Sequence, residues 1–247
     1  MRSQADPRLA VRDLTRTFRG SGGYRNLSLS ILRGETLVVL GPSGAGKSSL
    51  ITTLAGIDHA STGSIHVDGN DVTRHAPGAR DVAVVFQDMP LYDHLSALEN
   101  VSLAMSSLRL TAGQRTARLN DALAIVDITS IASRRAAALS GGERARVSIA
   151  RVLARQPKVA LLDEPYAAVD RIFRGALRTS VAEKLRSFGT ATLHVTHDPI
   201  EANELADRVA IMIDGTIRQT GTMNEVRAAP AEVAVTALLK VEEEFDA

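Results

Sequence analysis

The sequence predicts an α/β fold with a mostly parallel sheet, an antiparallel β layer near the start and an inserted helical subdomain. Residues 36–50 give the first observation, because a β-branched and leucine strand there runs through a glycine-rich turn into a helix. Several apolar runs are nearly continuous, which is typical of strands covered by helices on both faces: 82–86, 159–163, 191–196 and 208–214. A long stretch, 88–138, has helical spacing instead.

Composition indicates a folded domain that is not a global polycation. Of the 247 residues, 45% are hydrophobic and 23% are charged, and the net charge is only +1. We therefore expect no nucleic-acid partner. The chain has no cysteine, which excludes disulfides and thiolate metal sites and suits a reducing cytoplasm. The start lacks the apolar core of a signal peptide, and no apolar run is long enough for a transmembrane helix.

The antiparallel layer is predicted by the first third of the chain. Residues 9–18 and 26–32 alternate apolar and polar side chains, which is the period of half-buried strands. The glycine-rich segment between them reads as a turn, and another strand pair is expected around 64–69.

Residues 41–48 carry the pattern of a phosphate-binding loop. The spacing G-x-x-x-x-G-K-[ST] is met by Gly41, Gly46, Lys47 and Ser48. In such a loop the backbone N–H groups surround a polyphosphate, the lysine adds charge and the serine hydroxyl ligates Mg²⁺. One alternative is a glycine-rich turn that binds no ligand. A dinucleotide-binding turn is disfavoured, because the glycines do not follow the spacing G-x-G-x-x-G. The expected nucleoside triphosphate contacts are Gly41, Pro42, Ser43, Gly44, Ala45, Gly46, Lys47, Ser48 and Ser49.

The helical stretch has recognisable start signals. Thr111 is a candidate N-cap, and the apolar stripe that follows contains Leu119, Leu123 and Val126. We read 88–138 as the inserted helical subdomain.

A second glycine-rich segment opens the next helix. Ser140 and Glu143 alone would make a capping box and an ordinary helix start. Gly141 and Gly142 remain unexplained by that interpretation, since side chains usually support a helix at these positions. Close approach of an anion to the helix N-terminus explains them, so we expect a second phosphate contact here.

Polar side chains follow the buried strands. Asp163 and Glu164 end the run 159–163, which places one carboxylate near Mg²⁺ and the next near an attacking water. Gln87 follows 82–86, and its amide can reach the metal or the water.

His197 follows the strand 191–196 at a predicted strand-to-helix turn. Asp198 is a candidate cap, Pro199 suits the first helical position and Glu201 is the expected capping-box acid. A histidine in such a turn is usually structural, but beside a phosphate site its ring can donate to a γ-phosphate. After Ile217 we expect one last small helix and then an acidic, solvated tail.

Together the motifs resemble those of the ATP-binding subunits of ABC transporters, over nearly the whole chain. The resemblance assigns the Walker A motif to 41–49, the Q-loop to Gln87, the signature to 139–143, the Walker B motif to 159–165, the D-loop to 167–170 and the switch histidine to His197. Phe18 falls where the family stacks an aromatic ring on adenine, and Tyr24 is the competing candidate. Glu143 replaces the commoner glutamine, and AAVD replaces SALD but keeps Asp170.

The resemblance implies an ATPase whose two subunits enclose two MgATP molecules. The implied catalytic residues are Glu164 as general base, His197, Gln87 and Lys47. The implied metal ligands are Ser48, Gln87 and Asp163. The implied nucleotide contacts outside the phosphate loop are Phe18, Asp170 and, from across the dimer, Ser140, Gly141 and Gly142.

Partners and location also follow from the resemblance. Segments 84–101 and 195–222 are most similar to importers of sugars, anions and other small solutes. The implied partners are a second ATP-binding subunit, most simply another copy, transmembrane permease subunits and a solute-binding protein. Such a protein works peripherally at the cytoplasmic face of the inner (plasma) membrane.

The expected organisation is a single ATPase domain, 1–247. Its nucleotide-binding core comprises 1–87 and 139–220, and the helical subdomain is 88–138. Residues 221–247 form a C-terminal helix and tail, without the regulatory domain that many sugar-importer subunits carry.

A non-transport ATPase of the same family, acting on DNA or ribosomes, is the alternative. Such proteins carry long coiled-coil insertions or two tandem cassettes, whereas here the interval from Gln87 to Leu139 is short and one cassette is present. A non-hydrolysing regulatory subunit would predict a damaged Glu164 or His197, and both residues are intact.

Residues 89–95 form a candidate docking segment. We expect Met89, Leu91, Tyr92 and Leu95 to help form a groove that receives a short helix of the membrane subunit. Packing of these side chains in the core is the alternative.

Overall fold

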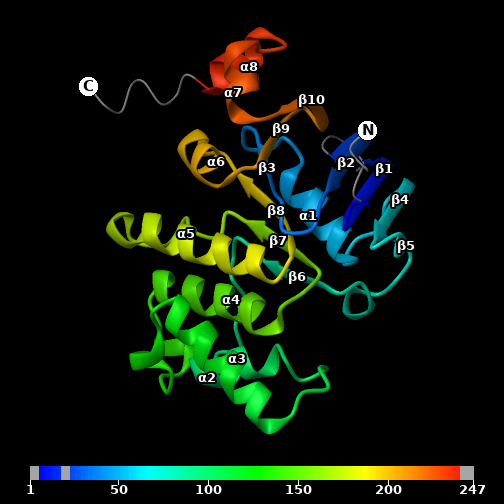
Figure 1. The fold of residues 1–247 in the computed structure, drawn as a ribbon. Helices are drawn as coiled ribbons and strands as arrows, with labels where there is room; N and C mark the ends of the chain where they lie inside the picture. Colours follow the sequence, from blue (N-terminus) through cyan, green and yellow to red (C-terminus); the bar gives the residue numbers. More distant parts are fainter. Residues whose placement is uncertain (1–5, 18–22, 240–247) are drawn as a thin grey trace.

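The computed structural model describes residues 6–17 and 23–239, arranged as two sheets with helices around them (Figure 1). The strands are β1 (Leu9–Thr17), β2 (Gly23–Ile31), β3 (Thr36–Leu40), β4 (Thr62–Val67), β5 (Asn70–Asp71), β6 (Val82–Val85), β7 (Val159–Asp163), β8 (Ala191–Thr196), β9 (Arg208–Ile213) and β10 (Thr216–Gly221). The α-helices are α1 (Lys47–Ala55), α2 (Ala97–Leu103), α3 (Ala112–Ile125), α4 (Gly141–Arg155), α5 (Arg171–Ser187), α6 (Pro199–Leu205), α7 (Met223–Ala228) and α8 (Val233–Leu239). Short 3₁₀ turns are η1 (Pro77–Ala79), η2 (Thr129–Ile131) and η3 (Ala136–Ala138).

The two sheets confirm the predicted fold class. The larger sheet has six strands in the order β10-β9-β3-β8-β7-β6, and its five pairings are parallel except for β9 with β10. The smaller sheet is antiparallel, with the order β2-β1-β4-β5. In Figure 1 this small sheet lies on the right, away from α2 and α3 at the bottom, which pack on α4.

Alternating side chains of β3 divide the core into two layers. Val38 and Leu40 join the apolar cluster formed with α4 and α5, while Leu37 and Val39 join the cluster formed with α1 and the antiparallel sheet. The expectation of helices on both faces is therefore only partly correct, because α1 shares the second face with the antiparallel sheet. The apolar sides of β1 and β2 also need covering, so one face of the large sheet packs against them and α1 together.

Arg80 holds the end of α1, the helix that follows the phosphate loop. Its side chain is only 1% exposed, and its guanidinium donates hydrogen bonds to Thr53 O at 2.9 Å and Leu54 O at 3.1 Å. It also donates to Thr73 O at 2.8 Å and His75 O at 2.9 Å. A cation at the helix C-terminus satisfies carbonyls that have no partner within the helix and complements the helix dipole.

The predicted helix starts are confirmed. Thr111 forms a capping box with Gln114 at the start of α3, and Leu123 and Val126 of the predicted apolar stripe are buried, with Leu119 partly buried. Ser140 and Glu143 form the capping box of α4.

The glycine-rich turn predicted between the first two strands ends earlier than expected. β2 begins at Gly23, so residues 23–25 belong to a strand instead of the predicted turn. Residues 18–22 lie outside the described part of the chain.

The small helix expected after Ile217 is present but begins only at Met223. Residues 216–221 form β10, which pairs with β9 through a tight turn at Asp214 and Gly215, both with positive φ. Asp-Gly is a strong hairpin signal, and it precedes two short helices rather than one. The acidic end, 240–247, lies outside the described residues. Across residues 6–17 and 23–239, no helix combines the length and apolarity required to cross a membrane.

Candidate nucleotide site

Four parallel strands bring the predicted polar residues to one edge of the large sheet. The phosphate loop follows β3, His197 follows β8, Glu164 follows β7 and Gln87 follows β6. These strands are neighbours in the order β3-β8-β7-β6, so their carboxyl ends lie side by side. Ligands of open α/β sheets bind at this edge.

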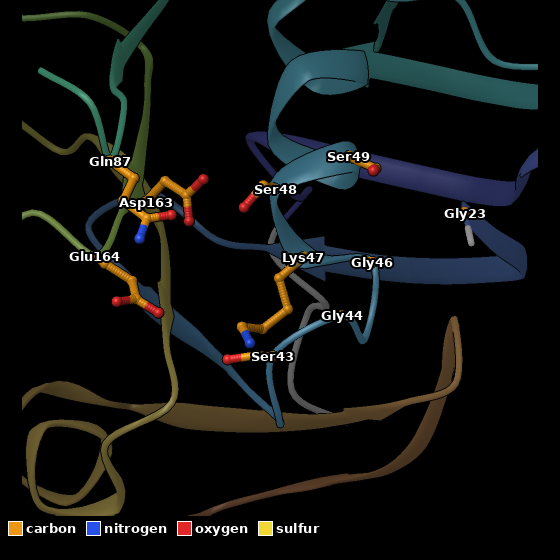
Figure 2. Close-up of a pocket in the computed structure, with 10 residues that line it drawn as sticks. All are labelled: Gly23, Ser43, Gly44, Gly46, Lys47, Ser48, Ser49, Gln87, Asp163 and Glu164. Atoms are coloured by element: carbon orange, nitrogen blue, oxygen red, sulfur yellow. The ribbon is translucent and has the colours of Figure 1, made fainter. Parts of the chain in front are cut away.

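A pocket of about 350 Å³ lies at this edge. Figure 2 shows Gln87, Asp163 and Glu164 on one side, facing Ser48 and Lys47 on the other. The pocket thus unites residues predicted from three separate motifs. Its lining residues are Gly23, Ser43, Gly44, Gly46, Lys47, Ser48, Ser49, Gln87, Asp163 and Glu164.

Gly46 fixes the shape of the phosphate loop. It has φ +98° and precedes α1 without a side-chain cap, so the first N–H groups of the helix have no side-chain partner from this position. A Cβ at Gly46 would lie 2.6 Å from Gly23 O, which requires glycine at this contact. Gly23 was not predicted as a pocket residue, because a single glycine in a glycine-rich turn carries no distinguishing signal.

Lys47 is folded into the loop. Its side chain is 7% exposed, and Nζ donates to Gly41 O at 2.7 Å and to Pro42 O at 2.9 Å. Burial lowers the pKa of Lys47, although the nearby carboxylates of Glu164 and Asp163 act in the opposite direction. Gly41 and Pro42 therefore orient the lysine without lining the pocket themselves. Ala45, also predicted in the loop, is buried in the core.

Asp163 provides a buried carboxyl beside oxygen donors suited to Mg²⁺. It is 4% exposed, and burial raises its pKa, while a hydrogen bond with Ser48 and the charge of Lys47 lower it. Gln87 shares the pocket. Mg²⁺ is usually held by one or two carboxylates together with substrate phosphates, and the set fits that pattern. Within 6–17 and 23–239 no group of three or more His, Cys, Asp or Glu residues could hold a metal alone.

Glu164 and His197 are in direct contact. Glu164 Oε1 lies 2.7 Å from His197 Nδ1, and the two residues also line a small cavity of about 60 Å³. Glu164 has φ +46°, an uncommon conformation for a residue with a side chain, while its N–H donates to Val195 O at 3.0 Å. The sheet thus fixes the backbone of Glu164, and the carboxylate reaches both the main pocket and the histidine.

The turn after His197 differs from the prediction in one respect. Asp198 accepts hydrogen bonds from the N–H groups of Ile200 and Glu201, which confirms the cap, and Pro199 begins α6. The predicted capping-box role of Glu201 is wrong. Its side chain is buried and lies near His194 and Arg178, because these inward-facing groups offer it better partners than the turn does.

The signature residues lie away from the pocket. Ser140 and Gly141 are exposed at the start of α4 and do not line it. A Cβ at Gly142 would lie 3.0 Å from Ala168 O, so contact with the 167–170 loop accounts for part of its glycine requirement. Asp170 is exposed at the start of α5 and makes no capping hydrogen bond. Ser140, Gly141 and Asp170 are therefore open to solvent, whereas Gly142 is half-buried against the 167–170 loop.

The two adenine-stacking candidates have different outcomes. Phe18, the first choice, lies outside the described residues. Tyr24 is only 1% exposed and is packed in the core below the antiparallel sheet, so the structure contradicts its role as a stacking platform.

The candidate docking segment is only partly exposed. Tyr92 is 48% exposed, and Leu91 and Leu95 are partly buried. Met89 is 5% exposed and belongs to the core, so its predicted place on the docking surface is wrong. The backbone of Met89 also has a positive φ of 46°.

Known proteins with similar sequences belong to ABC transporters. The profile of the family described as ABC transporter matches residues 24–167. The chain is 36% identical over 220 residues to the trehalose import ATP-binding protein SugC of Mycobacterium tuberculosis, covering 89% of this chain and 56% of that protein. It is 36% identical over 233 residues to the sn-glycerol-3-phosphate import ATP-binding protein UgpC of Cupriavidus metallidurans, covering 94% and 64% respectively.

A solved structure shares the fold. A dimeric ATP-binding cassette in a post-hydrolysis state, bound to ADP and Pi, superposes with a TM-score of 0.79 at 27% identity, covering 87% of this chain and 98% of that one. The chain spans only 56% to 64% of the two import proteins that it matches. Because the family profile covers more than half of the sequence, the chain belongs to the ABC transporter family.

Proposed function

We propose that this protein hydrolyses ATP as one of two subunits that enclose two MgATP molecules and thereby drive solute import through membrane-spanning partners. One observation carries the proposal. A single pocket combines the phosphate-loop Lys47, the buried Asp163 and the strand-end Glu164, whose carboxylate contacts His197 at 2.7 Å. This is the set of groups that binding and hydrolysis of a nucleoside triphosphate require.

Binding would begin at the phosphate loop. The backbone N–H groups at the start of α1 would surround the phosphates, and Lys47 would transfer hydrogen bonds from Gly41 O and Pro42 O to the outer phosphates. Ser48, Asp163 and Gln87 would hold Mg²⁺. When bound, that ion neutralises charge that develops on the phosphate oxygens.

Hydrolysis would use the contact between Glu164 and His197. Glu164 would accept a proton as water attacks the γ-phosphorus, the bond from the γ-phosphorus to the β,γ-bridging oxygen breaks, and ADP and phosphate leave. His197 would orient the Glu164 carboxylate or donate to the γ-phosphate, since its ring nitrogen is within hydrogen-bond distance of that carboxylate. The strained backbone at Glu164 is typical of a functional position that its surroundings must hold.

Two subunits are required because each contributes half of a site. Ser140 and Gly141 are exposed, and neither they nor Gly142 line the pocket of their own subunit. A second subunit, which we propose is another copy, would receive these residues against its own nucleotide. The dimeric cassette bound to ADP and Pi supports this arrangement.

Import is favoured by the relatives, whose names describe import of trehalose and of sn-glycerol-3-phosphate. Permease subunits, joined by a solute-binding protein, would select the solute. The protein would then work peripherally at the cytoplasmic face of the inner membrane.

The proposed hydrolytic role is tested with Glu164→Gln. The amide preserves the shape of the site but cannot accept the proton, so steady-state ATPase activity should fall by roughly 10²-fold or more. ATP binding should remain, and closed dimers should accumulate. Glu183→Gln, on the exposed face of α5, is the matched control and should leave the rate unchanged. An ATPase rate within about threefold of wild type would remove Glu164 from the role of base.

A further inference from the structure

A buried polar cluster lies directly behind the catalytic pair. Its four members are almost inaccessible to solvent: Tyr166, Arg178, His194 and Glu201, with exposures of 2%, 7%, 1% and 6%. Burying this many polar groups is costly unless each has a partner, so the cluster needs an explanation beyond filling space.

The cluster joins the two segments that carry Glu164 and His197. Tyr166 follows Glu164 and Pro165, and its ring stacks on His194 with the centroids 5.8 Å apart and the planes at 20°. His194 itself lies on β8, three residues before His197. Its backbone pairs with β3 on one side and β7 on the other, so it is anchored at the centre of the sheet.

Glu201 completes the link on the other side of His197. Its Oε2 lies 3.4 Å from His194 Nε2, and its Oε1 lies 4.0 Å from an Arg178 nitrogen. The His194 contact is too long for an ordinary hydrogen bond, and the buried Nε2 has no hydrogen-bond partner among the residues that the structure describes, so Glu201 is the carboxylate it faces. Burial alone would raise the pKa of Glu201, but interactions with His194, Thr196 and Arg178 lower it, so the carboxylate is ionised near neutral pH.

Arg178 fixes the cluster from α5. Its Nη2 lies 2.6 Å from Glu204 Oε2, and this ion pair joins α5 to α6 beside Glu201. Glu201 and Tyr166 also line the 60 Å³ cavity that contains Glu164 and His197. A displacement of Glu201 would therefore reach the catalytic pair directly.

We propose that His194 is a positioning residue, which sets the separation of Glu164 and His197 by stacking on Tyr166 and binding Glu201. The inference rests on the roles proposed above for Glu164 and His197. The positive φ of Glu164 is a conformation that persists only where neighbours enforce it, and two residues later the buried Tyr166 is held by its stacking on His194. Displacement of a catalytic group by about 1 Å can cost on the order of 10²-fold in rate.

The test compares His194→Leu with His194→Gln. Leucine keeps an apolar contact with Tyr166 but removes the nitrogen that faces Glu201, so kcat should fall about tenfold or more. KM for ATP should change little, because His194 lies on β8, whereas the phosphate loop connects β3 to α1. Glutamine places an amide nitrogen near the position of Nε2 and should restore most of kcat. His66→Leu and His66→Gln, on β4 of the antiparallel sheet, are matched controls and should leave both parameters unchanged.

Thermal unfolding identifies variants that fail to fold. If His194→Leu does not fold, Glu201→Gln alone supplies a second route, because it removes the charge that faces His194 and should lower kcat with little change in KM. If both single variants fold, the double variant should lose no more activity than the more impaired single variant, because both changes break the same contact. The inference is overturned if a folded His194→Leu protein keeps kcat within about twofold, if Leu and Gln are equally impaired, or if the two losses simply multiply. Full activity of Glu164→Gln would instead reject the proposed mechanism, whatever the His194 variants do.

Discussion

Arg80 supports the phosphate loop indirectly, because it holds the far end of α1, the helix that the loop precedes. It donates four hydrogen bonds to backbone carbonyls, two of them at the end of α1, while being almost fully buried. A Cβ at Gly56 would lie 2.5 Å from its Nε, so the C-cap of α1 also requires a glycine there. The helix that begins at the phosphate loop is thus fixed at both ends.

Arg80→Met should destabilise the protein by roughly 2–4 kcal/mol, because buried carbonyls lose a charged donor that methionine cannot replace. Denaturation in urea measures the loss. Arg109→Met, at an exposed position before α3, is the control and should change the free energy of unfolding by less than about 0.5 kcal/mol. Equal stability of the two variants would show that Arg80 has no such role.

Residues in short local motifs were predictable, and isolated residues were not. The spacing around Lys47 and Ser48 specifies its own geometry, so the sequence alone located the phosphate loop. Arg80 and His194 depend on partners far along the chain, and an arginine or histidine in a strand or turn gives no sign of them. Glu201 was mispredicted for the same reason. Its sequence position suits a capping box, but its side chain turns inward to His194, which the sequence does not indicate.

At the scale of elements, the candidate docking segment between Gln87 and α2 combines a fixed backbone with a half-exposed tyrosine. Tyr92 N–H donates to Asn100 Oδ1 at 2.9 Å, and Asn100 in turn donates to Tyr92 O at 3.1 Å. The backbone is therefore held from α2, while the half-exposed Tyr92 ring remains available. Arg144 on α4 also contacts Asp93 at 2.9 Å, which joins this segment to the helix that follows the signature.

Tyr92→Asp should reduce association with permease-containing membranes by roughly tenfold or more, since a charge would replace an aromatic contact. ATP binding should be unchanged, because the backbone bonds of the segment do not involve the ring. Membrane flotation with labelled ATP measures both. Leu32→Asp, a comparably exposed apolar position after β2, is the control and should remain associated. A folded Tyr92→Asp protein with full membrane association would contradict the docking role.

Strands with strong apolar patterns were predictable as elements, and weakly patterned ones were not. β7 and β8 are continuous apolar runs that match their predicted limits. β10 is a half-exposed edge strand whose pattern is mixed, and its position depends on the hairpin turn at Asp214 and Gly215. The face of the large sheet that meets the antiparallel layer was also misjudged, because a continuous apolar run does not reveal whether helices or strands cover it.

At the scale of the whole molecule, the arrangement of the motifs is the central finding. The phosphate loop, Asp163 and Glu164 share one pocket, whereas Ser140 and Gly141 lie exposed outside it. We propose that a second copy supplies the signature residues to this pocket across the interface. Sequence order could not establish this separation, because it depends on where α4 lies relative to β3.

Mixed dimers test that proposal most directly. Lys47→Ala disables the phosphate loop and Ser140→Arg blocks the signature by steric overlap, so each homodimer should trap little ATP in the closed state. In a mixed dimer both lesions fall in one site and the other is intact. With random pairing about half of the dimers are mixed, so roughly a quarter of all sites should trap nucleotide. Once subunit exchange is demonstrated, trapping no greater than the average of the two variants would contradict composite sites between copies of this chain.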